Sequence, residues 1–223
     1  GLLVRRVVHH GGIRAVGSVG DNTSIDVTIT SLIDHNLSPI SATAVSAPVV
    51  LQPMALVSVS VVLQCGGGRT DAGWVVPLTV QFFTPGVDVM TAAPNYSFNQ
   101  NTTKVGGTAS ANVSGIIPGS YDITVKSAHT LVNVKLNVVI SQSSATVNMG
   151  TLIEGNAKEN TADDAIVIDI LDFSVLSTAF GKQLGVDAGY NAQADFNRDG
   201  IVEILDFSLL STNFNKVSPI TVP

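Results

Sequence analysis

Asp195, Asn197 and Asp199 alternate along a six-residue stretch that ends at Gly200, and Asp206 follows six positions later. This spacing matches the calcium loop D-x-[DN]-x-[DN]-G-x5-E, with aspartate in place of the final glutamate. Ca²⁺ takes six to eight oxygen ligands, and alternate side chains of a curled loop point toward a common centre. Glycine at the sixth position permits the sharp turn that such a loop needs.

Two further ligands complete the predicted site. Ile201 stands at loop position 7, where the backbone carbonyl faces the ion, and Glu203 stands at position 9, from which it reaches the ion directly or through water. Asp206 at position 12 falls in the first turn of an expected helix and closes the shell. The alternative interpretation is an Asp-rich turn that only caps a helix.

The loop belongs to an internal repeat. Residues 167–180 read VIDILDFSVLSTAF and residues 201–214 read IVEILDFSLLSTNF, with nine of fourteen positions identical at an offset of 34. Repeat arrays of this period need at least three copies, so two copies favour a paired loop–helix unit. In the second copy an apolar helical stripe is expected at Ile204, Phe207, Leu210 and Phe214.

The first copy fits the calcium pattern less well. Aligned without gaps, its ligand positions hold Thr161, Asp163, Ala165, Asp169 and Asp172, and Ala165 has no side-chain oxygen. Alternatively, the loop begins at Asn156 and Asn160, with about five residues inserted before Val167. Asp163, Asp169 and Asp172 are the preferred ligands, with Asn156 and Asn160 as further candidates.

The duplicated unit over about residues 154–216 is similar to type I dockerins. The resemblance rests on Asp-x-Asn-x-Asp-Gly in the second loop, on Asp206 at position 12, and on Leu-Asp-Phe-Ser-x-Leu entering the helix. It implies a module that folds on binding Ca²⁺ and docks onto a cohesin. In that family, positions 10 and 11 of each loop help to choose the partner.

In this sequence those positions are apolar pairs, Ile170-Leu171 and Ile204-Leu205. The usual Ser/Thr pair is absent, which argues against a standard type I cohesin as partner. The pairs predict either an apolar contact with the partner or packing against the chain's own sandwich.

The rest of the chain has the pattern of short strands. The 223 residues are rich in Val, Ile and Thr, which favour strands. Alternation is clearest in Tyr121–Lys126, and further strands are expected at 96–99, 131–140 and 145–152, with a strand pair over Trp74–Phe83. The run GGTASANVSGIIPGSYDITVKSAHTL resembles the prealbumin-like sandwich of carboxypeptidase regulatory and Cna-B repeats, with its Pro118-Gly119 turn. That resemblance covers about residues 76–152 and implies a non-catalytic spacer.

The predicted fold class is therefore mainly β, with antiparallel sandwich regions followed by a small helical, dockerin-like calcium-binding domain. The expected divisions are a β-rich region over 1–75, with an apolar strand at Leu2–Val8, a sandwich over 76–153, the double repeat over 154–217 and a tail over 218–223.

Composition limits the functional classes. The formal net charge of −6 leaves no broad basic surface for nucleic acid, and no apolar run reaches the ~20 residues of a membrane span. Only 13% of residues are charged, against about 25% in typical soluble domains, which favours a secreted or cell-surface protein. The lone Cys65 is either inert or available for an intermolecular disulfide.

No catalytic set is recognisable, so the chain is not expected to be an enzyme. His35 and His129 stand alone in the sequence, and the adjacent His9 and His10 would point to opposite faces of a strand. Two functions remain open: docking onto a separate cohesin-like domain, or self-assembly with other copies into a calcium-stabilised filament or layer.

Overall fold

The computed structural model describes residues 22–25, 47–50, 54–65, 68–141, 144–158 and 167–223. The chain divides into two compact units, 1–53 and 54–223. In the first, β1 (Asn22–Ile25) pairs antiparallel with β2 (Ala47–Val50). The strand expected at Leu2–Val8 and the histidines at 9, 10 and 35 lie outside the described residues.

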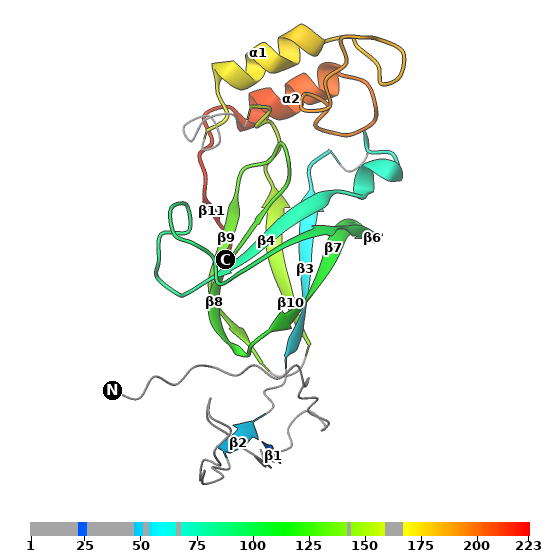
Figure 1. Cartoon of the computed structure of the whole chain (residues 1–223). Helices are drawn as coiled ribbons and strands as arrows, with labels where there is room; N and C mark the ends of the chain where they lie inside the picture. The colour runs from blue at the N-terminus through cyan, green and yellow to red at the C-terminus, as the bar shows by residue number, and fades with distance from the viewer. Residues whose placement is uncertain (1–21, 26–46, 51–53, 66–67, 142–143, 159–166) are drawn as a thin grey trace, which may run out of the picture. The chain divides into compact units, whose positions relative to one another are not determined.

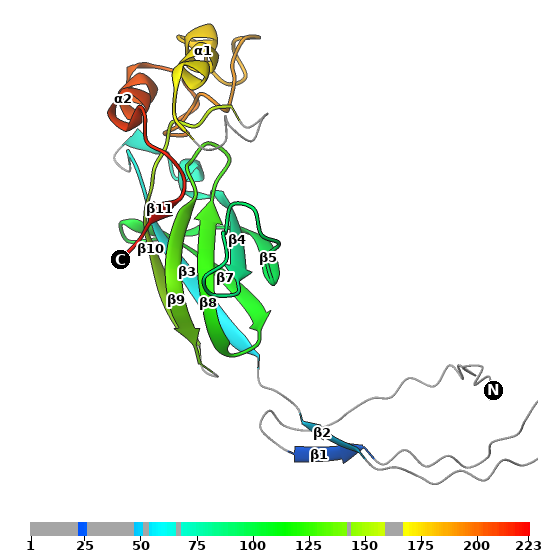
Figure 2. The same ribbon diagram turned by 90° about the vertical axis from the view of Figure 1, so that its left-hand side faces the viewer.

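The second unit is a β-sandwich followed by two short helices, which confirms the predicted mainly-β class (Figures 1 and 2). One sheet has the order β10-β3-β7-β6, formed by Ala145–Leu152, Ala55–Leu63, Thr108–Ile116 and Thr103–Val105. The other has the order β11-β9-β8-β4-β5, formed by Ile220–Thr221, Asn133–Ile140, Gly119–Lys126, Pro77–Phe83 and Tyr96–Asn101. The strands expected at 96–99, 131–140 and 145–152 correspond to β5, β9 and β10.

Strand pairing extends the sandwich beyond its expected limits. Pairing is antiparallel except that β10 runs parallel to β3 and β11 runs parallel to β9, so both sheets are mixed. β3 lies inside its sheet although the sequence analysis placed it in the N-terminal region ending at residue 75. β11 joins the other sheet from the segment expected to be a tail. Both pairings join residues far apart in sequence, which local periodicity does not reveal.

The core of the sandwich follows from the alternation of the strands. In β3 every second side chain, from Ala55 to Leu63, is buried, and in β4 the same holds for Leu78, Val80 and Phe82. Side chains at alternate positions share one face of a strand, so the inner faces of the two sheets meet in a continuous apolar core.

The predicted strand pair over Trp74–Phe83 is wrong in its first part. Ala72–Trp74 form a 3₁₀ turn, and β4 begins only at Pro77. The hydroxyl of Thr102 donates to the Trp74 carbonyl at 2.6 Å and accepts from the Val76 N–H at 2.8 Å. A side chain thus satisfies backbone groups that would otherwise need a neighbouring strand.

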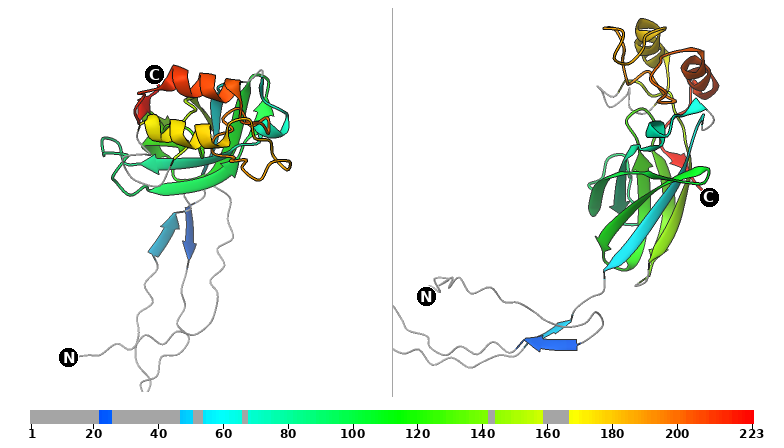
Figure 3. Two further views of the ribbon diagram at one scale, coloured as in Figure 1. Left: turned by 90° about the horizontal axis from the view of Figure 1, so that it is seen from above. Right: turned by 90° about the vertical axis from the view of Figure 1, so that its right-hand side faces the viewer.

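The helices α1 (Ile170–Ala179) and α2 (Ile204–Asn213) lie side by side at one end of the sandwich (Figures 1 and 3). The expected apolar stripe of α2 is mostly exposed, because only Leu210 of its four members is buried. The buried face of α2 instead consists of Asp206, Leu210 and Asn213. Among the described residues, no helix has the length and apolarity to cross a membrane.

Candidate metal loops and docking face

Asp195 opens the second loop and is almost fully buried. Its carboxylate accepts hydrogen bonds from the N–H groups of Asp199 at 3.1 Å and Gly200 at 2.9 Å, and from the Tyr190 hydroxyl at 2.7 Å. Burial, followed by these interactions with Asp195, raises the pKa of Tyr190. The loop therefore curls around this carboxylate.

Asp206 closes the loop from the first turn of α2 and is wholly buried. One carboxylate oxygen accepts from the N–H groups of Phe196 at 2.7 Å and Asn197 at 3.2 Å, and the other accepts from the Glu203 N–H at 2.8 Å. Burial raises the pKa of Asp206 to about 6, and the charge of Asp195 raises it further, although the backbone hydrogen bonds oppose the shift.

Asn197 and Asp199, in the middle of the loop, are hydrogen-bonded to each other. Asn197 is wholly buried; its side-chain oxygen accepts from the Asp199 N–H at 3.0 Å, and its amide nitrogen donates to the Asp199 carboxylate at 2.8 Å. Asp199 also accepts from the Ile201 N–H at 2.9 Å. Gly200 has a φ of +93°, which explains the glycine at this position.

The predicted ligands of the second loop thus lie within one tight turn, and their donor set is composed of oxygens alone, the type that Ca²⁺ prefers. Within the described residues, no three His, Cys, Asp or Glu side chains converge on a point that a metal ion could occupy. The carboxylates of Asp195 and Asp206 are directed at loop N–H groups instead. A carboxylate oxygen has more than one acceptor site, so these bonds are compatible with the residues serving as ligands.

In the first repeat, Asp172 repeats the bonding of Asp206. Its carboxylate accepts from the Asp169 N–H at 2.8 Å and from the Lys158 N–H at 3.0 Å, and burial raises its pKa. Asp169 also caps α1 by accepting from the Leu171 N–H at 2.7 Å.

These bonds fix a correspondence between the two loops. The Lys158 N–H stands where that of Asn197 stands, which places Asn156 opposite Asp195. The sequence distance from Asn156 to Asp172 is 172 − 156 = 16, whereas Asp195 to Asp206 is 206 − 195 = 11, so the first loop is five residues longer. This agrees with the gapped alignment. Thr161, Asp163 and Ala165 of the ungapped alignment lie outside the described residues, as does Asn160.

Asn156 is wholly buried, and neither polar atom of its side chain has a hydrogen-bond partner among the described residues. A buried amide in this state costs free energy unless something else satisfies it.

The two repeats are bridged in a symmetric way. Gln183, after α1, forms a bridge with Ile201 of the second loop, and Val217, after α2, forms one with Val167 of the first loop. The partners are again 34 residues apart: 167 + 34 = 201 and 183 + 34 = 217. The sequence repeat is therefore a structural repeat with approximate two-fold symmetry.

The residues predicted to bind a partner are exposed to matching extents in both repeats. Ile170 and Ile204 are 62% and 61% exposed, and Leu171 and Leu205 are both 38% exposed. The symmetry is broken at one point, because Leu205 lies beside Gly68 of the sandwich: a Cβ on Gly68 would stand 3.3 Å from its side chain. Leu205 thus packs partly against the chain's own sandwich.

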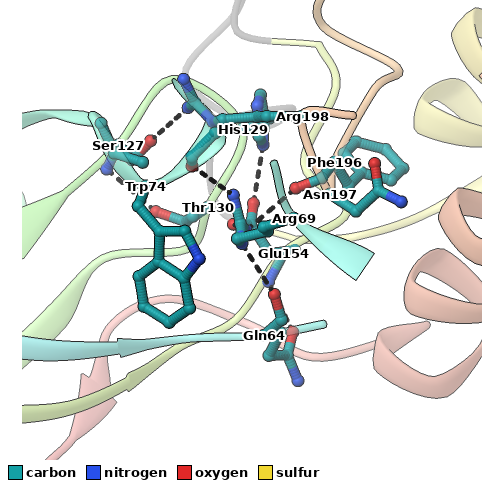
Figure 4. Close-up of polar contacts among 12 residues, drawn as sticks. Gln64, Arg69, Trp74, Ser127, His129, Thr130, Glu154, Phe196, Asn197 and Arg198 are labelled. Carbon is teal, nitrogen blue, oxygen red and sulfur yellow. Dashed lines mark hydrogen bonds and ion pairs between the residues drawn. The ribbon is translucent and has the colours of Figure 1, made fainter. Parts of the chain in front are cut away.

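A buried polar network joins the sandwich to the second repeat, and the sequence analysis missed it (Figure 4). Glu154 pairs with Arg69 at 2.5 Å and with His129 at 2.6 Å, and all three side chains are buried. The prediction that His129 stands alone is therefore wrong; its ring also contacts Phe196, with centroids 5.5 Å apart. These partners are up to 85 positions apart in sequence, and no local pattern connects them.

Asn213 extends this junction from the last turn of α2. Its amide nitrogen donates to the Gln64 side chain and to the Glu154 carbonyl, both at 2.7 Å. The first repeat has Ala179 at this position, the only non-conservative difference between the two fourteen-residue copies. That difference was the available sequence signal for the junction.

No protein-family model matches the sequence, and a comparison with curated proteins finds no match. Two solved structures do resemble the chain: the crystal structures of an N-terminal and a C-terminal interface mutant of a type II cohesin–X-dockerin complex from Acetivibrio cellulolyticus. The first has a TM-score of 0.56 at 23% identity, and the second 0.55 at 21% identity. Each match covers 74% of this chain and 97% of the other, so the likeness extends over nearly the whole solved chain and shows a shared sandwich-plus-helices fold similar to an X-module with its dockerin.

Proposed function

We propose that this chain is a non-catalytic, extracellular module that binds Ca²⁺ and docks onto a cohesin-like domain of another protein. The observation that carries the proposal is the symmetric pair of loop–helix units at the end of the sandwich, each presenting an exposed apolar pair. The similarity in fold to X-dockerin chains that form complexes with a type II cohesin supports it.

In the second loop, the proposed ligands are Asp195, Asn197, Asp199 and Asp206, with the Ile201 carbonyl and Glu203 completing the shell. Calcium bound there would neutralise carboxylates that the fold buries close together, which is unfavourable without a counter-charge. An ion that binds only the folded form adds stability, by roughly 2.7 kcal/mol at a hundredfold excess over its Kd.

In the first loop we propose Asn156, Asp169 and Asp172 as ligands. The other two candidates, Asn160 of the gapped alignment and Asp163 of the ungapped one, lie outside the described residues. The unpartnered side chain of Asn156 supports this assignment, because a bound cation would satisfy its oxygen. Asn156 takes the place that Asp195 has in the second loop and brings no charge, so the first loop should bind Ca²⁺ more weakly than the second.

The proposed docking face consists of Ile170, Leu171 and Ile204, with Leu205 contributing from its position beside the sandwich. Exposed apolar side chains grouped on neighbouring helices mark interaction surfaces rather than solvent-facing ones. Their character favours a type II cohesin over a type I partner that reads Ser/Thr pairs.

Calorimetry can test both parts with the intact chain. Titration with Ca²⁺ should release or absorb heat that Asp195→Ala reduces and that Asp88→Asn, a change in an exposed turn, leaves intact. A type II cohesin should then bind in Ca²⁺ and be lost in EGTA.

Ile204→Lys should weaken cohesin binding roughly tenfold or more, because central apolar contacts dominate interfaces. Val139→Lys is the matched control, since Val139 is an exposed apolar residue on β9. If the calorimetric titration detects no heat of Ca²⁺ binding, the proposal is refuted. Sedimentation of polymers in Ca²⁺ without cohesin would instead support the self-assembling alternative.

A further inference from the structure

The sandwich holds the second loop by its backbone. Arg69 donates to the Phe196 carbonyl at 3.0 Å, and the Thr70 hydroxyl donates to the Arg198 carbonyl at 3.3 Å (Figure 4 shows the Arg69 contact). Phe196 and Arg198 occupy loop positions 2 and 4, between the ligand positions 1, 3 and 5. The sandwich therefore contacts the peptide units that connect successive ligands.

Each of these peptide units is held at both ends. The unit after Phe196 accepts from Arg69 through its carbonyl and donates to Asp206 through the Asn197 N–H at 3.2 Å. The unit after Arg198 accepts from Thr70 and donates to Asp195 through its N–H, that of Asp199, at 3.1 Å. Both contacts thus connect a sandwich side chain, through one rigid peptide plane, to a carboxylate at the loop centre.

Arg69 is itself fixed in one orientation. Its side chain is fully buried, and it donates to the carbonyls of Gln64 at 3.0 Å and Gly73 at 3.2 Å while pairing with Glu154. A guanidinium held at several donors is a rigid reference point rather than a mobile surface charge.

The approach of the sandwich to the loop is also close. A Cβ on Gly73 would stand 2.7 Å from the Arg198 carbonyl oxygen, and the Arg198 guanidinium reaches back to donate to the Ser127 hydroxyl at 2.8 Å. The contact surface therefore follows the loop backbone closely.

We propose that Arg69 and Thr70 are positioning residues for the second calcium loop, so that the sandwich and the repeat together set its affinity for Ca²⁺. This inference rests on the proposed calcium binding. Holding the peptide planes in place before the ion binds lowers the ordering cost of binding. Loss of the Arg69 and Thr70 contacts should therefore lower the affinity of the loop for Ca²⁺ without removing any ligand.

The test compares variants of the intact chain at a temperature far below their unfolding midpoints in EGTA. Arg69→Met and Thr70→Val remove the two contacts. Val57→Ala is the matched control, because it truncates a wholly buried side chain of β3 that belongs to the sandwich core. Affinity of the second loop is read from Tb³⁺ luminescence excited through Tyr190, whose hydroxyl lies 2.7 Å from Asp195, with Ca²⁺ as competitor.

We expect Arg69→Met to weaken Ca²⁺ binding about tenfold or more and Thr70→Val about threefold to fivefold, with Val57→Ala unchanged. Wild-type affinity in both contact variants would overturn the inference, as would an equal loss in Val57→Ala, which would reduce the effect to global stability. If Arg69→Met does not fold, Thr70→Val decides alone. Failure of the wild type to bind Tb³⁺ or Ca²⁺ would refute the proposed function instead. That outcome is distinguishable from failure of this inference, in which the wild type binds and the contact variants bind equally well.

Discussion

Asn213→Ala converts the second repeat to the residue that the first repeat has at the same position. The side chain is wholly buried and donates two hydrogen bonds of 2.7 Å, to the Gln64 side chain and to the Glu154 carbonyl. After the change Gln64 keeps a second donor, the Glu154 N–H at 2.8 Å, whereas the Glu154 carbonyl loses the donor that Asn213 supplied. The substitution therefore acts on the junction between helix and sandwich.

The size of the effect follows from these contacts. The Asn213 oxygen also accepts from the Lys216 ammonium at 2.7 Å, so the substitution removes three short hydrogen bonds. At about 1 kcal/mol each, and with the cost of a buried acceptor left without that donor, the free energy of unfolding should fall by about 3–5 kcal/mol. For a unit of this size, each kcal/mol corresponds to a melting shift of roughly 2–4 °C. Urea unfolding in EGTA, followed by circular dichroism, measures the change directly.

Thr212→Ala is the control, because Thr212 is the exposed neighbour of Asn213 on the same helix turn. It should change the free energy of unfolding by less than about 0.5 kcal/mol. If Asn213→Ala costs no more than this control, the buried network does not stabilise the junction, and the interpretation of the Ala179/Asn213 difference fails.

Three further predictions concern single residues. Because the pKa of Asp206 is raised to about 6 in the folded state, its contribution to stability is fully present below its unfolded pKa, near 3.8, and is lost as the pH rises through about 6; urea midpoints in EGTA should show this loss, and Asp206→Asn should abolish it. Gly73→Ala should destabilise the chain by about 1–3 kcal/mol through its clash with the loop, whereas Gly107→Ala, with open space around its Cβ, should not; equal urea midpoints would contradict the close approach. Asn156→Asp should raise the Ca²⁺ affinity of the first loop in calorimetry, and an unchanged isotherm would argue against Asn156 as a ligand.

Local patterns in the sequence predicted the elements well. Strict alternation identified β8 through Tyr121–Lys126, and β10 has the bounds expected, Ala145–Leu152. Alternation of apolar and polar residues is a property of each strand by itself, so a single sequence reveals it, although in β8 the polar Asp122 and Thr124 are buried as well. The 34-residue repeat likewise placed both helices, since α1 begins at Ile170 and α2 at Ile204, which is the same offset of 34.

Contacts between distant segments were not predictable in the same way. The parallel pairing of β10 with β3 joins residues roughly ninety positions apart, and Arg69 contacts Glu154 and Phe196, which are 85 and 127 positions away in sequence. Nothing in the residues around Arg69 or His129 indicates a buried partner, because a charged residue is normally exposed. The exposure of Phe207 and Phe214 was also missed, since an apolar helical stripe is usually buried.

Comparison of the two copies of the repeat distinguishes what local sequence determines from what contacts with distant segments determine. Their nine identical positions include Asp172 and Asp206, which bond in the same way, and Ile170 and Ile204, which are equally exposed. Where the copies differ in chemistry, the Asn213 side chain donates to the Gln64 side chain and the Glu154 carbonyl, which the methyl group of Ala179 cannot do. Identity between the repeats therefore encodes the loop–helix unit that both share, whereas the departure at Asn213 adds a polar side-chain attachment to the second repeat. Both repeats are nevertheless attached to the sandwich, because the Asn156 N–H of the first loop donates to the His129 carbonyl at 3.1 Å. The two apolar pairs therefore differ chiefly in that Leu205 lies beside Gly68.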